Sequence, residues 1–463
     1  MQCVSSFARN LGGMIMGSYI PSTYEERLAM LAEIGMKSED DLFAALPESI
    51  KIKELNIPSG ISEVEVSKKL RTLADKNVVY KSIFRGAGSY SHYIPSIVKT
   101  VTSKEEFLTA YTPYQAEISQ GVLQSIFEYQ TQICELTGMD VSNASVYDGA
   151  VAAAEAVFMC QDRKKKGVVV AGTADPQTIE VIKTYCESRD VEVKVVGGRS
   201  EDSCGNCSDI FSVDAEALAN VLADDTACVY IQSPNYYGVI EDMDALASAA
   251  HEKGAKVIMG ANPISLGLLK TPGEYGADIA VGEGQPLGLP IGFGGPYLGY
   301  MACTKDMMRK LPGRIVGETE DHDGRRAFVL TLQAREQHIR REKASSNICS
   351  NEALCAMTAS VYMAAMGPAG LKQVAEACTA NAHYLAGKLA EVEGVKLVTE
   401  KTFFNEFVTR LPVEAKVLEE KLAERGILSG LPVGDHCMLW CCTELNDKEE
   451  IDALVDAVKE VVK

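Results

Sequence analysis

The sequence predicts an α/β protein that has a large domain with a mostly parallel sheet, a smaller α+β C-terminal domain and a helical N-terminal segment. Between about residues 145 and 305, short apolar runs such as Val168–Ala171 and Ala227–Ile231 alternate with helical patterns. Runs that are apolar along their whole length are typical of strands buried on both faces. After about residue 345 the chain changes to longer helical patterns with short strands between them, which indicates a separate α+β domain.

Capping-box patterns predict helices in the N-terminal segment. Thr23–Glu26, Ser38–Asp41 and Ser62–Glu65 each place a hydroxyl residue three positions before an acid, so the two residues can satisfy each other's free backbone N–H groups. Gly35 is expected to end the first helix and Pro47 the second. Residues 1–16 are treated as an uncertain leader. The expected boundaries are 17–115 for the N-terminal segment with its loops, 116–335 for the large domain and 336–463 for the C-terminal domain.

Six strands are expected in the large domain, at 168–171, 193–196, 227–231, 256–259, 278–281 and 300–303. Asp244–Lys253 is an expected helix that ends at Gly254. In the C-terminal domain we expect a helix at 352–366, a break at Gly367-Pro368, a second helix to about 393, strands at 395–398 and 406–410, and a last helix from Asn446. Sheets of this kind bind ligands at the carboxyl ends of their strands.

The composition excludes several classes of function. The chain has 463 residues with 64 acids against 45 basic residues, a net charge of −19, which disfavours nucleic-acid binding. No apolar run approaches the roughly 20 residues that span a bilayer, so we expect no membrane segment. Fourteen cysteines are spread along the chain, several in apolar runs, which favours free thiols in a reducing cytosol. Cys204 and Cys207 form one C-x-x-C pair, which fits a surface loop better than a metal or redox site, and we expect no metal centre.

Two segments have little periodicity and mix Gly, Pro, Tyr and polar residues. They are Phe84–Pro95 and Tyr111–Gly121. Such composition is typical of irregular loops whose side chains have roles other than packing.

Several long motifs, taken together, resemble a known family. They are 111–121 (YTPYQAEISQG), 129–138, 143–145, 278–295 (DIAVGEGQPLGLPIGFGG), 311–317 and 332–349 (LQAREQHIRREKASSNIC). In this order they resemble the P-protein family of the glycine cleavage system, and within it the α-subunit type of the split form, from about Ser18 to the C-terminus. The resemblance implies a pyridoxal-phosphate (PLP)-dependent aminotransferase-like fold (fold type I). It also implies decarboxylation of glycine, with PLP as the electron sink, and transfer of the aminomethyl group to the lipoyl arm of the H-protein.

Two residues that PLP chemistry needs are absent from the positions that the resemblance assigns to them. The loop 282–295 contains no lysine, and Gln285 stands where lysine-bearing P-proteins have the Schiff-base lysine. Asn262 stands where PLP enzymes place the acid that pairs with the pyridine nitrogen, and an amide cannot neutralise that charge. The resemblance therefore implies no catalytic residue of this chain's own, and PLP on a β subunit instead.

The phosphate of PLP is expected at a helix N-terminus. The segment Ser145–Ala150, before a helix of small residues from about Val151, is in the right place. Asp148 would repel a phosphate there, and we favour a capping role for it.

In this fold two subunits share each active site, so this chain can contribute to the site of its partner. The candidates in the two irregular segments are Tyr90, His92, Tyr93, Tyr111, Tyr114, Gln115 and Glu117. Their polar groups suit the orientation of glycine or a lipoyl arm, although they can equally hold the loops in place. For His92 and His338 a structural hydrogen bond is favoured over catalysis. The basic residues Arg335, Arg340, Arg341 and Lys343 form either a salt-bridged helical face or a contact with an acidic β subunit or H-protein.

Three functional hypotheses follow. The first is the α subunit of a heteromeric, cytoplasmic glycine decarboxylase that is inactive alone, with two α and two β subunits expected from the resemblance. The second is a stand-alone PLP lyase that uses a lysine elsewhere in the chain. The third is a pseudoenzyme that acts only as a scaffold or regulator.

Overall fold

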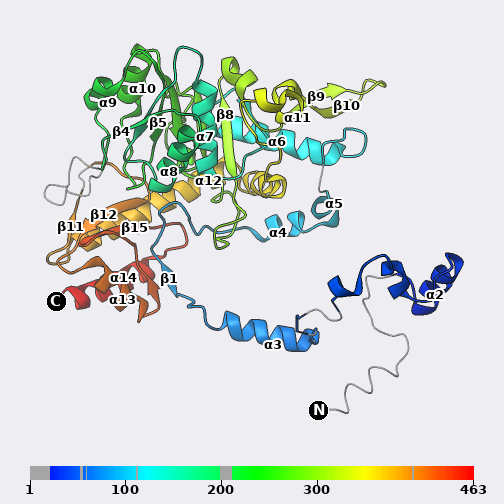
Figure 1. Cartoon of the computed structure of the whole chain (residues 1–463). Coiled ribbons are helices and arrows are strands. Elements are labelled where there is room, and N and C mark those ends of the chain that lie inside the picture. The colour runs from blue at the N-terminus through cyan, green and yellow to red at the C-terminus, as the bar shows by residue number, and fades with distance from the viewer. Residues whose placement is uncertain (1–20, 53–55, 59, 111–112, 199–210, 399–400) are drawn as a thin grey trace. The chain divides into compact units, whose positions relative to one another are not determined.

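The computed structural model describes residues 21–52, 56–58, 60–110, 113–198, 211–398 and 401–463 (Figure 1). The chain divides into two units, 1–78 and 79–463. The predicted boundaries at residues 16, 115 and 335 stay predictions. The motif of Cys204 and Cys207 and the candidate Tyr111 lie outside the described residues.

The first unit contains α2 (Tyr24–Glu33), η1 (Glu39–Phe43), η2 (Glu48–Ile50) and α3 (Glu63–Ala74). The capping boxes of Thr23 and Ser62 are confirmed, because each side chain accepts the N–H of the glutamate that it faces. The helix predicted after Ser38 is wrong, since the chain there forms only the five-residue 3-10 helix η1. Asp41 accepts the N–H groups of Lys37 and Ser38, so the predicted capping box is present, but the turn that follows it is the tighter 3-10 form.

The second unit contains a seven-stranded sheet with the order β2-β8-β7-β6-β5-β3-β4. Its strands are β2 (Val141–Ser142), β3 (Gly167–Ala171), β4 (Val193–Val196), β5 (Thr226–Gln232), β6 (Lys256–Gly260), β7 (Ile279–Glu283) and β8 (Gly299–Cys303). All pairs from β7 to β4 are parallel, whereas β8 pairs antiparallel with both β7 and β2. The six predicted strands and the mostly parallel sheet are therefore confirmed.

Helices cover both faces of this sheet (Figure 1). Val168 and Val170 pack with α7 (Gly149–Cys160) and α8 (Pro176–Glu187) on one face. Val169 and Ala171 point to the other face, which is covered by α6 (Gln120–Thr137), α9 (Ala215–Val221), α10 (Met243–Glu252) and part of α12. Successive residues of a strand alternate between faces, so burial on both sides explains why these strands are apolar throughout.

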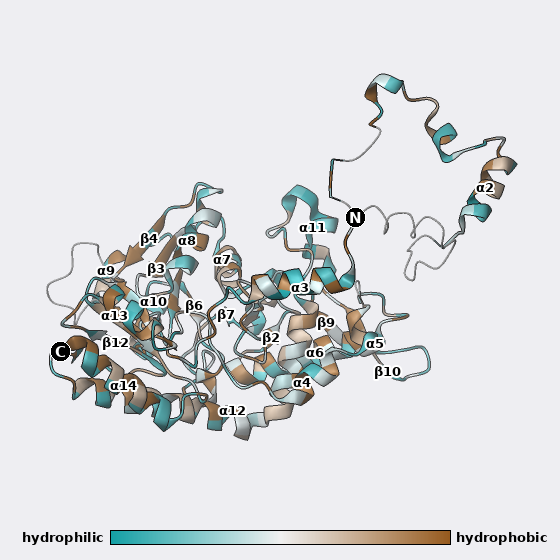
Figure 2. Cartoon of the chain, turned by 90° about the horizontal axis from the view of Figure 1, so that it is seen from below, coloured by the Kyte–Doolittle hydropathy of each residue, from teal (hydrophilic) through white to brown (hydrophobic). Residues whose placement is uncertain are grey.

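The C-terminal part contains α12 (Ala353–Ala390) and a small antiparallel sheet with the order β11-β12-β15-β14. The predicted break in α12 is confirmed, because Gly367 has a φ of 62° in front of Pro368. The sheet consists of β11 (Lys396–Leu397), β12 (Glu406–Arg410), β14 (Leu431–Gly434) and β15 (Cys437–Cys441), and α13 (Ala415–Ala423) and α14 (Lys448–Val462) pack with it. Figure 2 shows the hydrophobic and hydrophilic faces of α14.

One described helix, α12, is long and apolar enough to cross a membrane by length and composition, and half of its apolar window is buried inside the protein. Its buried side chains belong to the cores under both sheets. That burial is typical of the central helix of a folded core.

The remaining elements are short connections around the two sheets. They are β1 (Ser82–Ile83), which pairs with β13 (Ile427–Leu428), α4 (Ser96–Thr102), α5 (Glu105–Leu108), η3 (Ser265–Gly267), η4 (Lys305–Lys310), the hairpin β9 (Val316–Glu320) and β10 (Arg326–Leu330), η5 (Gln333–Arg335), α11 (Gln337–Arg340) and η6 (Arg341–Lys343).

Candidate active site

A pocket of about 580 Å³ opens at the carboxyl ends of the central strands. Its walls include Asp175 after β3, Gln232 at the end of β5, Asn262 after β6 and Glu283 at the end of β7. The first turn of α7 and residues 87–90 form further walls. The strand order reverses at β3, which lies between β4 and β5. The pocket is therefore at the place where open α/β sheets bind ligands, as the sequence predicted.

The carboxylate of Glu283 lies at the N-terminus of α7. Its Oε2 accepts the N–H of Gly149 (3.0 Å), and its Oε1 accepts those of Gln285 (2.9 Å) and Leu298 (3.1 Å). Burial raises the pKa of Glu283 to about 7, while the three N–H donors favour the ionised form and limit the rise. This carboxylate thus takes up donors that a bound phosphate would need.

Asp148 occupies the same helix end. Its Oδ1 accepts the N–H of Val151 at 2.8 Å, which confirms the predicted capping role. Gly149 follows it, and a Cβ there would lie 2.6 Å from the backbone nitrogen of Glu283. The absence of a side chain at Gly149 therefore lets β7 and α7 approach closely enough for the Glu283 carboxylate to reach the helix.

Gln285, which we expect from the sequence at the position of the Schiff-base lysine, is 1% exposed and serves as a tether. Its Oε1 accepts the backbone N–H of Tyr90 (3.0 Å), and its Nε2 donates to the carbonyl oxygens of Tyr90 (2.9 Å) and Leu289 (2.7 Å). All of its side-chain polar atoms are therefore engaged in holding the segment 84–95 against the loop after β7.

Asn262 lies in the pocket wall after β6. Its Oδ1 accepts the N–H of Ile264 at 3.0 Å. The side chain closes a local turn and carries no charge to neutralise a pyridinium ion.

The residues of this pocket do not fit PLP. The pocket has no lysine among the residues that line it, and Glu283 and Asp148 already accept N–H groups at the N-terminus of α7. A phosphate would meet two carboxylates there, and like charges in a partly buried site are costly.

Tyr90 connects the pocket to the small C-terminal sheet. Its hydroxyl donates to Glu406 Oε2 (2.7 Å), and Glu406 Oε1 accepts the N–H of Ala87 (2.7 Å). Burial raises the pKa of Glu406 to about 7 in spite of these two hydrogen bonds. The hydroxyl of Tyr90 is therefore already used inside this chain.

His92 and Tyr93 both contact Glu444. The Nδ1 atom of His92 lies 2.8 Å from Glu444 Oε2, and the Tyr93 N–H donates to Glu444 Oε1 at 2.6 Å. Burial acts to raise the pKa of Glu444, but the His92 and Tyr93 hydrogen bonds outweigh it and leave the pKa below its ordinary value. The ring of His92 is buried, whereas Tyr93 is 59% exposed. His92 thus has the structural hydrogen bond favoured by the sequence, and Tyr93 presents its ring to the outside.

The second irregular segment contacts a different part of the chain. The Tyr114 hydroxyl donates to Asn351 Oδ1 (2.8 Å), and the guanidinium of Arg314 lies 4.9 Å from the centre of the Tyr114 ring. Gln115 and Glu117 are exposed. Of the candidates in this segment, Tyr114 is thus engaged internally, and Gln115 and Glu117 are accessible.

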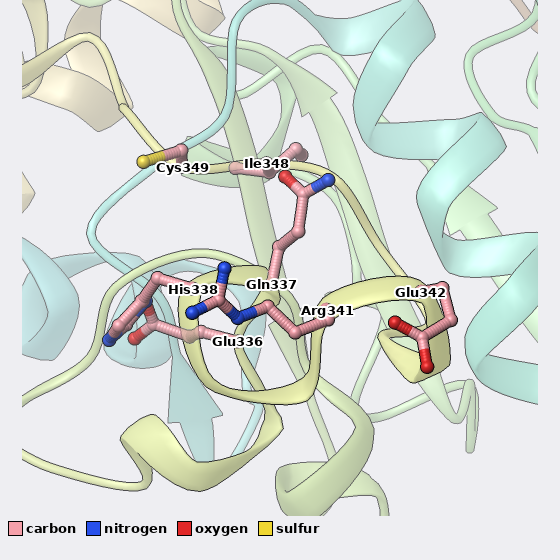
Figure 3. Close-up of a pocket in the computed structure, with 7 residues that line it drawn as sticks. All are labelled: Glu336, Gln337, His338, Arg341, Glu342, Ile348 and Cys349. Atoms are coloured by element: carbon pink, nitrogen blue, oxygen red, sulfur yellow. The ribbon is translucent and has the colours of Figure 1, made fainter.

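A second pocket, of about 530 Å³, contains part of the basic run. It is lined by Glu336, Gln337, His338, Arg341, Glu342, Ile348 and Cys349. Figure 3 shows Arg341 between Gln337 and His338, with Cys349 on the facing segment. Glu336 forms an ion pair with Arg314, and the Nδ1 of the exposed His338 lies 3.4 Å from Glu336.

The predicted salt-bridged helical face does not form in the described structure. Residues 333–343 make two 3-10 turns and the four-residue α11, so the four basic residues do not share one helix. Arg335 donates to the carbonyl oxygen of Gly313 (2.7 Å). Arg340, Arg341 and Lys343 are exposed and make no ion pair among the described residues.

Sequence reasoning missed the four acids that organise these sites. Glu283, Glu406 and Glu444 anchor the loops described above, and Glu336 anchors Arg314. Of these four acids, only Glu283 could have been predicted as a site residue from the sequence. It is a charged residue directly after an apolar strand, within the expected cofactor loop, and such a position lies at the carboxyl edge of the sheet.

The chain matches the family model "Glycine cleavage system P-protein" over residues 17–458. It is 48% identical over 456 residues to a probable glycine dehydrogenase (decarboxylating) subunit 1 of Moorella thermoacetica, a match that covers 96% of this chain and 100% of the relative. A protein of the same description from Desulfitobacterium hafniense is 46% identical, with 96% of this chain and 100% of the relative covered.

Solved structures agree with these sequence matches. The crystal structure of glycine decarboxylase (P-protein) of the glycine cleavage system in inhibitor-bound form superimposes with a TM-score of 0.87 at 44% identity, covering 96% of this chain and 100% of that chain. A C-DES mutant with glycine covalently linked to its PLP cofactor shares the fold alone, with a TM-score of 0.59 at 15% identity, covering 85% of this chain and 99% of that chain. The fold is that of PLP-dependent enzymes of fold type I, and the chain belongs to the P-protein family of the glycine cleavage system.

Proposed function

We propose that this chain is the α subunit of a heteromeric glycine decarboxylase. A lysine-bearing β subunit holds PLP and decarboxylates glycine, and the aminomethyl group passes to the lipoyl arm of the H-protein. The observation that carries this proposal is the pocket at the carboxyl ends of the sheet, where Gln285 and Glu283 make protein contacts at the positions that we assign to the lysine and the phosphate. Relatives that match over their full length are described as subunit 1, which supports a second subunit.

Within the complex, the accessible loop residues Tyr93, Gln115 and Glu117 are our first candidates to reach the partner's active site. Their side chains are exposed in this chain. Tyr90 and Tyr114 use their hydroxyls internally, and His92 uses its Nδ1 internally while its buried Nε2 has no partner among the described residues. We infer that these three residues position the loops instead. Tyr111 stays a candidate on its sequence alone.

Reconstitution tests the proposal. The full-length chain, the lysine-bearing subunit and their mixture are each measured for the visible absorption of bound PLP and for glycine decarboxylation with lipoylated H-protein. We expect both signals in the mixture and neither in this chain alone. A lone chain that binds PLP through one of its own lysines and decarboxylates glycine would support the stand-alone lyase and overturn the proposal.

Loop variants separate a contributing subunit from a scaffold. Tyr93→Phe, Gln115→Ala and Glu117→Ala are introduced into the complex, with Glu320→Ala in the β9–β10 hairpin as an exposed control. We expect at least one loop variant to lower kcat/KM by about 10-fold or more, as is typical when a positioning contact is lost, while the control keeps full activity. If these three variants and Tyr111→Phe are all fully active, the chain is only a scaffold.

We also propose that the complex works in the reducing cytosol. In support, every cysteine in the described part of the chain is a free thiol, and most of them are buried, where a thiol packs like a small apolar side chain. The net charge of −19 supports partners other than nucleic acid.

A further inference from the structure

The pocket at the carboxyl ends of the sheet has walls of one charge only. Asp148, Asp175, Glu283 and Glu352 line it, and none of its lining residues is Lys, Arg or His. Ordinary capping explains part of this charge, since Asp175 Oδ1 accepts the N–H of Gln177 (2.8 Å) at the start of α8. It does not explain Glu352, whose carboxylate has no hydrogen-bond partner among the described residues. Burial raises the pKa of Glu352, and the nearby negative charge of Asp148 raises it further.

A second, uncharged group in the same pocket also lacks a partner. Tyr230 lines the pocket and is only 4% exposed, yet its hydroxyl makes no hydrogen bond with any described residue. The hydroxyl packs over Gly260, where a Cβ would collide with it, and Asp175 is the charged group that acts on it. The hydroxyl is not among the fully buried polar atoms without a partner, so it opens into the pocket. There it is free to contact a bound molecule or water.

The size of the cavity and the spacing of its acids indicate which kind of cation it can bind. Two clusters of three or more metal-ligating side chains exist among the described residues, and neither includes a residue of this pocket. The four carboxylates are therefore too far apart for three of them to share one metal ion. A volume of about 580 Å³ is in the range of small-molecule sites. Tyr90, Tyr147 and Tyr297 also line it, and aromatic ring faces attract organic cations.

We propose that this pocket binds a small organic cation with more than one ammonium group, which pairs with Glu352 and Asp175 and donates a hydrogen bond to the hydroxyl oxygen of Tyr230. An ammonium group supplies the positive charge and the N–H donors that the unpartnered carboxylate and hydroxyl lack. The same walls repel phosphate. The cavity that fits PLP in lysine-bearing relatives of this fold would thus have the opposite charge preference in this chain. This inference holds whether or not the chain works with a β subunit.

Calorimetric titration of the full-length chain tests this inference. The probes are putrescine and spermidine, with MgCl2 and inorganic phosphate as comparison ligands. We expect saturable one-site binding of a polyamine and no binding of phosphate. Glu352→Gln and Asp175→Asn should each weaken the binding by about 10-fold or more, since each removes one charge from a partly buried pair, and Asn can still cap α8.

Two further variants separate a built site from the diffuse attraction of an acidic chain. Tyr230→Phe keeps the net charge and should weaken polyamine binding by about three-fold or more, the effect of one hydrogen bond. Glu187→Gln removes an exposed charge at the end of α8, outside the pocket, and should change the affinity by less than about two-fold. Circular dichroism confirms that each variant is folded.

Four results would each overturn the proposal. These are no saturable polyamine binding, an equal loss in Glu187→Gln and Glu352→Gln, binding of Mg²⁺ without either polyamine, and binding of inorganic phosphate at this site that Glu352→Gln strengthens. Full polyamine affinity in Tyr230→Phe would show that the Tyr230 hydroxyl does not contact the ligand.

Discussion

Replacement of Gln285 by alanine should release the segment 84–95 from the loop after β7. The side chain of Gln285 is 1% exposed and makes three hydrogen bonds to backbone groups of Tyr90 and Leu289, at 3.0, 2.9 and 2.7 Å. Each such bond contributes about 1 kcal/mol net, and more when its partner is left buried without a replacement. We therefore expect Gln285→Ala to lower the local stability of this segment by about 3 kcal/mol.

Hydrogen–deuterium exchange measures this effect where it occurs. The Tyr90 N–H loses its acceptor in the variant, and about 3 kcal/mol corresponds to exchange that is about 100-fold faster in peptides that cover residues 84–95. Local exchange is preferable to a global unfolding midpoint because the chain has two units and need not unfold in one step.

Gln177→Ala is the matched control for this measurement. Gln177 lines the same pocket, but its side chain is exposed and makes no hydrogen bond with described residues. Exchange in residues 84–95 should stay within about two-fold of the parent chain in this control. If Gln285→Ala also leaves the exchange unchanged, Gln285 does not tether the segment, and the reasoning from its hydrogen bonds is wrong.

Three further perturbations have defined outcomes. Gln285→Lys should not make the chain bind PLP, because Glu283 and Asp148 still accept the N–H groups of Gly149 and Val151 in α7; a variant that keeps a visible PLP absorption band after dialysis would contradict this. Glu283 has a folded-state pKa of about 7, above the ordinary 4.5, so the folded state holds its proton longer and stability should fall as the pH rises from 4.5 to 7. In Glu283→Gln, the loss of unfolding free energy over this pH range should be smaller by up to about 3 kcal/mol, as measured by denaturation at pH 5, 6 and 8. If the variant loses as much stability as the parent chain, Glu283 is not the cause of the pH dependence. Arg341→Glu should slow association with the β subunit and make the association rate less dependent on salt, whereas the exposed control Arg163→Glu should not. Equal association rates of the two variants would exclude the Arg341 surface as a contact.

The features predicted correctly from the sequence are those that a few neighbouring residues determine. Val168–Ala171 is apolar at every position because both faces of β3 are covered, and this is visible in the sequence as an uninterrupted run. The caps of Thr23, Ser62 and Asp148 use partners three residues away. At Ser38 the capping box is also present, but a cap does not determine whether the turn that follows it is α or 3-10.

The features that were missed depend on partners distant in the sequence. Gln285 and Tyr90 are 195 residues apart, and Tyr90 and Glu406 are 316 residues apart. A Gln at the lysine position could be identified from the sequence as a loss, but its hydrogen bonds required the fold. The conformation of the basic run also required the fold. Only the structure shows that the chain from Arg335 to Lys343 is divided into three short helical turns, so that its basic side chains do not lie on one helix.

The replacement of lysine that we infer at Gln285 would be part of a larger change in the loop after β7. In a site that holds PLP, the cofactor would join this loop to the N-terminus of α7. Here Glu283 makes that connection itself, through the Gly149 N–H, and Gln285, two residues later, connects the loop to Tyr90. Since these contacts come from the chain's own side chains, the walls of the pocket are held without a cofactor, and so is the segment that presents Tyr93. A site that had only lost its lysine would leave the N–H groups of α7 and the backbone of Tyr90 without partners, at a cost of about 1–3 kcal/mol for each buried group. The observed contacts therefore favour a subunit built to present its loops to a partner over a degraded enzyme.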